Sequence, residues 1–198
     1  DYVNLVGENF GSSINTLSTV TYGSKTGVEF QVNVSLCTMV IPHSKIQCPT
    51  IQGAGTLLKW IIIVDELQNV APTTSYDRPN ILSINGMTNT SIDANNLNPA
   101  GGEWIEINGT NLGPIGSNYP IEVTYGPSGF YYKATDCSIV VSRTILRCKT
   151  SAGVGVNHVW TIKLRGQQST QCSAESCKTS YKLPVISALV PNKMSTAG

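Results

Sequence analysis

The residues most able to do chemistry in this chain are its six cysteines, which form three local pairs. Six cysteines allow fifteen disulfide connectivities. Two of the pairs share a spacing of eleven residues and recur at equivalent positions of an internal repeat, so we predict one disulfide within each pair. Metal binding is the rival interpretation, and it is disfavoured because the chain has no C-x-x-C motif. The predicted disulfides are Cys37–Cys48, Cys137–Cys148 and Cys172–Cys177.

Acid–base and nucleophilic catalysis have few candidate groups. The two histidines, His43 and His158, occupy non-equivalent positions, and neither lies in a recognisable nucleophile motif with a serine or cysteine. The acidic pair at 65–66 is replaced in the repeat by Arg165 and Gly166, so no required acid is indicated there. We therefore expect a protein that is not an enzyme and that holds no cofactor and no metal.

Three N-x-[ST] sequons predict N-linked glycans at Asn33, Asn89 and Asn108. In FQVNVSL, Val32 and Val34 alternate with Asn33, which is expected to point to solvent from a strand. The same alternation in WIEIN places Asn108 on the outside, and Asn89 lies in a polar connector. Chance is the alternative origin, because a chain rich in Asn, Ser and Thr generates sequons freely. Disulfides and glycans together indicate an extracellular or cell-surface protein.

The composition favours strands and turns over helices. Glycine, proline, asparagine, serine and threonine are plentiful, whereas charged residues make up only 13% and the net charge is +1. Without a basic run, nucleic acid and anionic membrane are not indicated as partners. The longest apolar run, LLKWIIIVDEL, is too short to span a bilayer and predicts a buried strand. We expect any membrane attachment to use parts not in this chain.

The chain repeats itself at an offset of about a hundred residues. VTYG at 20–23 returns at 123–126, and the segment from Cys37 to Trp60 returns as Cys137 to Trp160. GENFG at 7–11 returns as GTNLG at 109–113, and the glycines and asparagine of both predict a tight turn with positive φ. Each copy contains several short alternating runs separated by Gly, Pro or Asn, which is the pattern of a small β-sandwich. The sequence therefore predicts an all-β protein of two tandem sandwiches, with Trp60 and Trp160 in the two cores.

The order of the repeated motifs resembles the IPT/TIG domain, the immunoglobulin-like fold shared by plexins, transcription factors and Met-type receptors. The motifs are a P-x-I opening, a Pro…Gly-Gly stretch, a G-x-N-[FL]-G turn, a V-x-Y-G strand, a cysteine pair ending in [IL]-x-C-x-T, and G-x-G before a tryptophan-bearing strand. The resemblance covers almost the whole chain. It implies immunoglobulin-like, E-set-type sandwiches in residues 1–78 and 79–183, and a protein partner bound by sheet faces, edges or loops.

Residues 184–198, PVISALVPNKMSTAG, resemble the opening of a third copy. Asp1 aligns with Glu103, so the first sandwich is expected to lack its own first strand. Two explanations stay open. Either the chain is part of a longer array whose next repeat begins at 184–198, or it is a polymer subunit whose residues 184–198 complete the next subunit by β-augmentation.

Three classes of function follow from these features. The favoured class is a non-enzymatic structural or adhesive extracellular module that contacts proteins, either itself or another cell-surface protein, with a filament subunit joined by strand complementation as its alternative. A Rel-like DNA-binding regulator is disfavoured by the near-neutral charge. A carbohydrate-binding module would need an exposed aromatic platform, at Trp104 or in the run 130–132. Possible contact residues are Trp104 and an insert that breaks the repeat symmetry, Ser173, Ala174, Glu175 and Ser176.

Overall fold

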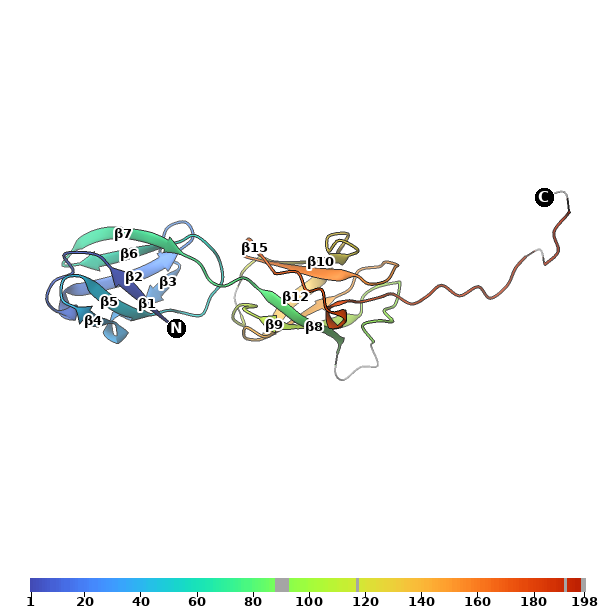
Figure 1. The fold of residues 1–198 in the computed structure, drawn as a ribbon, viewed down its shortest axis with the longest axis horizontal. Coiled ribbons are helices and arrows are strands. Elements are labelled where there is room, and N and C mark those ends of the chain that lie inside the picture. Colours follow the sequence, from blue (N-terminus) through green and yellow to red (C-terminus); the bar gives the residue numbers. More distant parts are fainter. Residues whose placement is uncertain (88–92, 117, 191, 197–198) are drawn as a thin grey trace.

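The computed structural model covers the 198-residue chain and describes all residues except 88–92, 117, 191, 197 and 198. The chain is nearly all β and forms two sandwiches arranged end to end, followed by an extended C-terminal segment (Figure 1). The fold class predicted from the sequence is confirmed. Within the described residues, no helix is long and apolar enough to cross a membrane.

The first sandwich has two antiparallel sheets around one core. One sheet has the strand order β1-β5-β4, and the other has the order β3-β2-β6-β7. A short 3-10 helix, η1 (Ile14–Thr16), precedes β2, and a second, η2 (Val34–Leu36), precedes β4. The strand bounds are β1 Tyr2–Val6, β2 Leu17–Gly23, β3 Phe30–Val32, β4 Thr38–Ile41, β5 Lys45–Pro49, β6 Leu58–Val64 and β7 Leu67–Thr74.

The second sandwich repeats this plan with one additional strand at the edge of its first sheet. In the part of the chain that the structure describes, its sheets have the orders β12-β13-β9-β8 and β11-β10-β14-β15. A 3-10 helix, η3 (Glu175–Cys177), follows β15. The strand bounds are β8 Asn80–Gly86, β9 Trp104–Thr110, β10 Ile121–Gly126, β11 Tyr132–Lys133, β12 Thr135–Val141, β13 Ile145–Lys149, β14 Val159–Leu164 and β15 Gln167–Gln168.

A stacked tyrosine and tryptophan form the centre of each core. Tyr22 and Trp60 lie 4.3 Å apart between ring centroids, and Tyr125 and Trp160 lie 4.1 Å apart. Each indole N–H donates to a threonine hydroxyl, so both tryptophans are buried without an unsatisfied donor. The motifs V-x-Y-G and G-x-G…W are repeated because they supply this aromatic centre.

The paired turns at 7–11 and 109–113 have the backbone that their sequence predicts. Asn9 and Asn111 adopt positive φ angles of 64° and 59°. The glycines that end the turns also have positive φ, which glycine adopts without strain. Phe10 and Leu112 are buried against the two cores. The repeated turn therefore closes one end of each sandwich.

The predicted sequon sites differ in their surroundings. Strand β3 ends at Val32, so the expected strand through Val34 is wrong there. Asn33 is exposed, and its side-chain oxygen accepts hydrogen bonds from the N–H and hydroxyl of Ser35. These bonds make Asn33 the N-cap of η2, which forms in place of a longer strand. Asn108 is half-buried on the central strand β9. Asn89 lies outside the described residues.

Candidate interaction site

All six cysteines are joined in disulfides within the sandwich that contains them. Cys37–Cys48 and Cys137–Cys148 link adjacent segments of one sheet in each copy, and Cys172–Cys177 closes the insert after β15. Because Cys48 and Cys148 are fully buried, the first two bonds belong to the cores. The disulfides therefore stabilise the scaffold and present no reactive thiol.

Strand β1 occupies the place in the first sandwich that β9 occupies in the second. Val3 lies opposite Cys48 on β5, just as Ile105 lies opposite Cys148 on β13. In the second sandwich, however, the other edge of β9 is paired along its length with β8. Strand β1 is the end strand of its sheet, so this edge remains open. Val3 is consequently only half-buried, whereas Ile105 is fully buried.

A cavity of about 540 Å³ adjoins the open edge of β1. It reaches the aromatic centre of the first core, because Tyr22, Leu58, Trp60 and Tyr76 contribute to its lining together with the start of β1. These residues are the counterparts of the second core's Tyr125, His158, Trp160 and Tyr181. An open cavity that reaches core residues of one sandwich marks a place where the packing is incomplete.

The second sandwich fills the same place with its own chain. Leu97, on the segment that follows β8, is fully buried. Its N–H donates to Ser180 O at 2.9 Å, and its carbonyl accepts from the N–H of Lys182 at 2.8 Å. Further along, the Gly153 N–H donates to Pro99 O at 2.9 Å. The cavity of the first sandwich therefore corresponds to the space that residues 93–102 occupy in the second.

A pair of glycines indicates how closely a strand approaches this edge. A Cβ atom on Gly109 would lie 2.2 Å from the carbonyl oxygen of Asn80 on β8, so only glycine fits beside that strand. Gly7 is the counterpart of Gly109 in the first sandwich, and the three atoms nearest to its Cβ position belong to the ring of Phe10. The first sandwich thus has the same glycine at the point where a neighbouring backbone would pass.

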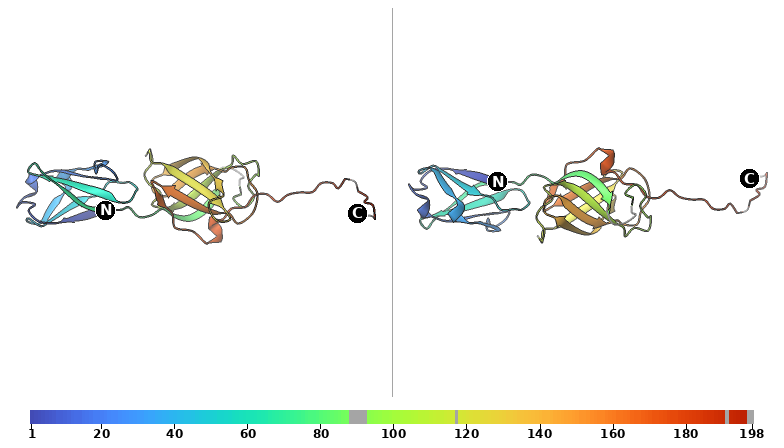
Figure 2. Two further views of the ribbon diagram at one scale, coloured as in Figure 1. Left: turned by 90° about the horizontal axis from the view of Figure 1, so that it is seen from above. Right: turned by 90° about the horizontal axis from the view of Figure 1, so that it is seen from below.

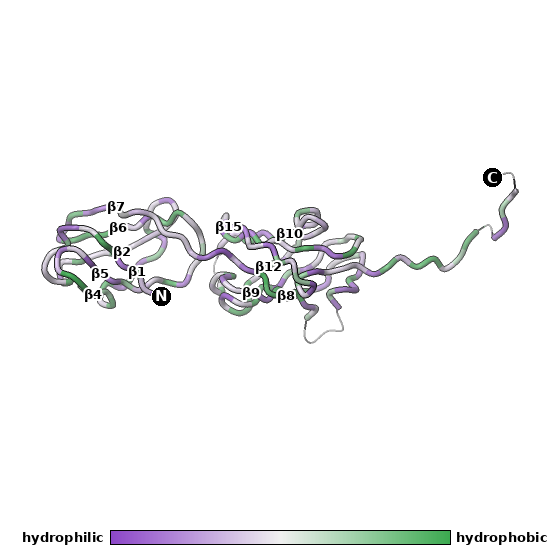
Figure 3. The backbone as a smooth tube through the Cα atoms, in the orientation of Figure 1, coloured by the Kyte–Doolittle hydropathy of each residue, from purple (hydrophilic) through white to green (hydrophobic). Residues whose placement is uncertain are grey.

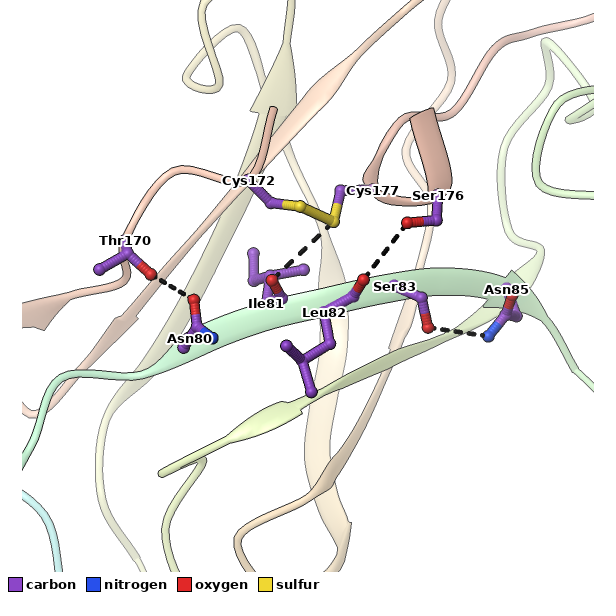
Figure 4. The surroundings of a disulfide bond; sticks show 9 residues. All are labelled: Asn80, Ile81, Leu82, Ser83, Asn85, Thr170, Cys172, Ser176 and Cys177. Atoms are coloured by element: carbon purple, nitrogen blue, oxygen red, sulfur yellow. Dashed lines mark hydrogen bonds between the residues drawn. A yellow bond between two sulfur atoms is a disulfide. The ribbon is translucent and has the colours of Figure 1, made fainter. Parts of the chain in front are cut away.

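The insert after β15 covers the outer edge of β8 in the second sandwich (Figure 4). The Thr170 N–H donates to Pro79 O at 3.0 Å, and the Ser176 hydroxyl donates to Leu82 O at 3.3 Å. The sulfur of Cys177 lies 3.8 Å from Ile81 O. An uncovered edge strand is a template for pairing with other chains. The second sandwich therefore has this edge covered, while the first has its corresponding edge open.

The two sandwiches are joined by side chains of the turn after β14. The Arg165 guanidinium contacts the carboxylate of Glu29 and lies 4.8 Å from the centroid of the Tyr119 ring. Gln167 accepts from the Gly55 N–H at 3.1 Å and donates to Tyr76 O at 2.8 Å. Burial acts to raise the pKa of Glu29, but hydrogen bonds from Ser24 and the nearby guanidinium hold it below its usual range. The joint is therefore a defined contact that combines charge, hydrogen bonds and ring packing.

Replacing Arg165 with alanine is expected to loosen this joint. The variant loses the ion pair and the ring contacts, worth roughly 1 kcal/mol together at a partly exposed site. Small-angle X-ray scattering and residual dipolar couplings should show a wider range of orientations between the sandwiches. Lys163→Ala, at an exposed position of the same hairpin, is the control and should keep the parent range. An unchanged range in Arg165→Ala would show that the joint does not depend on this side chain.

The other predicted contact residues lie apart from the β1 edge. Trp104 is half-buried, and the ammonium of Lys149 lies 4.9 Å from its ring centroid. The insert residues 173–176 are exposed beside β8. Phe130 and Tyr131 are exposed on the segment between β10 and β11 of the second sandwich. His158, directly before β14, is buried among tyrosine rings.

Sequence comparison finds no matching family model and no matching curated protein. Among solved structures, the chain is similar to the crystal structure of the surface glycan-binding protein PbSGBP-B from Prevotella bryantii. The TM-score is 0.49 at 15% sequence identity, over 87% of this chain and 35% of that one. The chain thus spans about a third of the length of that protein.

Proposed function

We propose that the chain is a non-enzymatic structural and adhesive module of an extracellular or cell-surface glycoprotein, and that it accepts a β-strand from a protein partner along the open edge of β1. The observation that carries the proposal is the incomplete first sandwich, whose edge and cavity match the space that residues 79–86 and 93–102 fill in the second. In β-augmentation, main-chain hydrogen bonds provide affinity and side-chain pockets provide specificity. The open edge of β1 offers main-chain hydrogen-bonding groups, and the cavity offers a pocket for side chains.

The compartment and the class of protein are part of the same proposal. Three disulfides are typical of oxidising, extracellular environments, and the exposed Asn33 is accessible to a glycan. The ordered motifs and the tandem sandwiches support an assignment to the IPT/TIG class. Within this assignment we place the two modules at 1–78 and 79–183 and a separate strand-forming segment at 184–198.

Supplying the missing strand in the same polypeptide tests the proposed acceptor site. Residues 79–102 joined ahead of Asp1 reproduce the covalent order of the second sandwich, because Asp1 aligns with Glu103. Burying three apolar side chains, offset by the cost of ordering the segment, should stabilise the first sandwich by a net 1–3 kcal/mol, as an order-of-magnitude estimate. Its melting temperature should rise by about 4–8 °C per kcal/mol, and the amides of β1 should become protected from hydrogen exchange.

The control is the same extension with aspartate at the grafted counterparts of Ile81, Ile84 and Leu97, which are buried in the second sandwich. This extension has the same length but cannot enter an apolar core. We expect it to leave the melting temperature and the exchange of β1 unchanged. If both extensions gave the same melting temperature and the same exchange, the first sandwich would not be a strand acceptor.

A further inference from the structure

We infer that the strand accepted by the first sandwich is residues 184–198 of a second copy of this chain, so that copies join head to tail. The inference rests on the proposed strand-acceptor function and names its partner. It is carried by the exposure of this segment, by its match to residues 79–102, and by the geometry of the edge that it would occupy.

Residues 184–190 and 192–196 form an exposed and largely apolar segment. All of residues 182–190 and 192–196 are exposed, and Figure 3 shows hydrophobic positions along this stretch. Ile186 is 80% exposed, Leu189 is 74% exposed and Met194 is 90% exposed. Contiguous exposed apolar side chains on a folded protein mark interaction sites. This segment therefore has the composition of a strand that is buried in a partner.

The segment carries apolar residues where the second sandwich uses its own. P-x-I opens both segments, at 79–81 and at 184–186, so Ile186 corresponds to Ile81 and Leu189 to Ile84. Further along, NNLNPAG at 95–101 resembles NKMSTAG at 192–198, with eight fewer residues between this stretch and the P-x-I opening in 184–198. Met194 thereby corresponds to Leu97, the fully buried residue whose place in the first sandwich is the cavity.

The pairing of β8 with β9 specifies the register on β1. Ile84 lies opposite Ile107 and Ile81 lies opposite Gly109. Transferred to the first sandwich, Leu189 lies opposite Leu5 and Ile186 opposite Gly7. The backbone of residue 185 then passes Gly7 as the backbone of Asn80 passes Gly109, and the absence of a side chain at Gly7 leaves room for this approach.

The direction of the segment carries it away from the β1 edge of the same pair of sandwiches. The three views of Figures 1 and 2 show residues 184–190 and 192–196 running away from the end of the second sandwich that is opposite the first. The segment in this conformation cannot reach β1 of its own chain. A contact between two different surfaces of identical copies is heterologous and leads to rings or open filaments.

The end surfaces of the chain fit the same arrangement. At the joint between the sandwiches, Gln167 packs over Gly55 at the end of the first core. In the head-to-tail arrangement, Leu67 of the following copy takes the place of Gln167, and Leu67 is 77% exposed. The surface that it would meet on the preceding copy includes the exposed Tyr131 and Val154. An apolar side chain thus faces an apolar surface, which favours a second joint of similar geometry.

A binding measurement with a labelled synthetic peptide of residues 183–198 tests the inference. The full chain, kept below the concentration at which it self-associates, is titrated against the peptide and fluorescence anisotropy is recorded. The parent peptide should bind. A peptide with Ile186→Asp and Leu189→Asp should bind at least about 100-fold more weakly, because each charge would enter the core. A peptide with Met194→Asp should bind about 10-fold or more weakly.

The matched control is a peptide with Val185→Asp and Val190→Asp. These positions correspond to Asn80 and Asn85, which are not buried in the second sandwich, so this peptide should keep the parent affinity. Equal binding of all four peptides, or no binding of the parent peptide, would overturn the inference. If the extension of 79–102 stabilises the first sandwich but the 183–198 peptide does not bind, the acceptor function stands and its partner is another protein. If neither experiment works, both proposals fail.

Discussion

Removing the Cys137–Cys148 disulfide by a double substitution to alanine is expected to destabilise the second sandwich by about 2–4 kcal/mol. The bond closes a loop of eleven residues, so its loss releases chain entropy in the unfolded state. Cys148 is also fully buried on β13, opposite Ile105, and the two lost sulfur atoms leave a gap in close-packed surroundings. The expected loss is a large fraction of the net stability of a domain, which is roughly 5–15 kcal/mol.

Urea denaturation followed by tryptophan fluorescence measures this loss, because each core contains one tryptophan, Trp60 or Trp160. The transition of the second sandwich should move to lower urea while that of the first stays within about 1 kcal/mol of the parent. The Cys37→Ala and Cys48→Ala pair is the matched control and should move the first transition instead. Equal shifts of both transitions in either variant would show that the sandwiches do not unfold as separate units.

Lowering the pH is expected to destabilise the second sandwich through His158. This side chain is 2% exposed and packs against the rings of Tyr125, Tyr132 and Tyr181. Among the described residues, neither of its ring nitrogens has a hydrogen-bond partner. Burial lowers the pKa of His158 below its ordinary value of 6.5, and nearby backbone groups of Val154 and Gly155 oppose this only in part.

The direction of the pH effect follows from proton linkage. Below pH 6.5 the unfolded chain binds a proton at this position while the folded chain does not, so stability is lost as the pH falls. The loss is at most about 1.4 kcal/mol per pH unit, and it continues until the folded state also binds the proton. Above pH 6.5 both states are neutral at His158, and this group no longer contributes to the pH dependence.

Replacing His158 with leucine, the residue at the equivalent position 58 of the first sandwich, should remove this contribution. Urea unfolding between pH 8 and pH 4.5 should show a shallower loss of stability for the second sandwich in the variant than in the parent. His43→Asn is the control, since His43 is exposed and its positive φ is tolerated by asparagine. A variant with the same pH dependence as the parent would contradict the assignment to His158.

The repeat made the fold predictable from the sequence. The alternating apolar residues around Trp60 and Trp160 indicated buried strands, and both tryptophans lie at core centres. The paired G-x-N-[FL]-G turns predicted positive φ at Asn9 and Asn111, because asparagine tolerates that region better than most side chains. Local patterns of this kind depend on a few neighbouring residues, so they can be recognised without the tertiary structure.

Two kinds of feature were not predicted, namely a local turn that competes with a strand and the contacts between residues that are distant in the chain. The strand expected through Val34 ends early because the side chain of Asn33 forms a local hydrogen-bonded turn that competes with the sheet. The Arg165–Glu29 contact joins residues far apart in the chain, and its only sequence signal is the substitution of arginine for Asp65 at equivalent turns. The burial of His158 likewise follows from the tyrosines that converge on it from three other segments.

The sequence predicted that the first sandwich lacks a strand, but it did not predict the shape of the resulting site. Alignment of Asp1 with Glu103 indicated a missing first strand, but it gave neither the cavity nor its correspondence to the space around Leu97. The role of the insert at 173–176 also needed the structure, because sequence spacing does not show that it lies along the edge of β8. The missing strand of the first sandwich becomes a candidate binding site once the structure shows that the second sandwich covers its corresponding edge, along β8.

Site-directed cross-linking tests the central claim most directly, because the register on β1 specifies which residues meet. Ser83 lies opposite Asn108 in the second sandwich, so Ala188 of one copy should lie opposite Val6 of the next. Directly opposed residues in antiparallel strands are close enough for a disulfide. A tagged chain with Val6→Cys is mixed with an untagged chain with Ala188→Cys and oxidised, and non-reducing electrophoresis follows. We predict that the tagged Val6→Cys chain forms a heterodimer with Ala188→Cys and much less of it with Val190→Cys. Equal yields from the two variants, or no heterodimer at all, would contradict the proposed strand exchange.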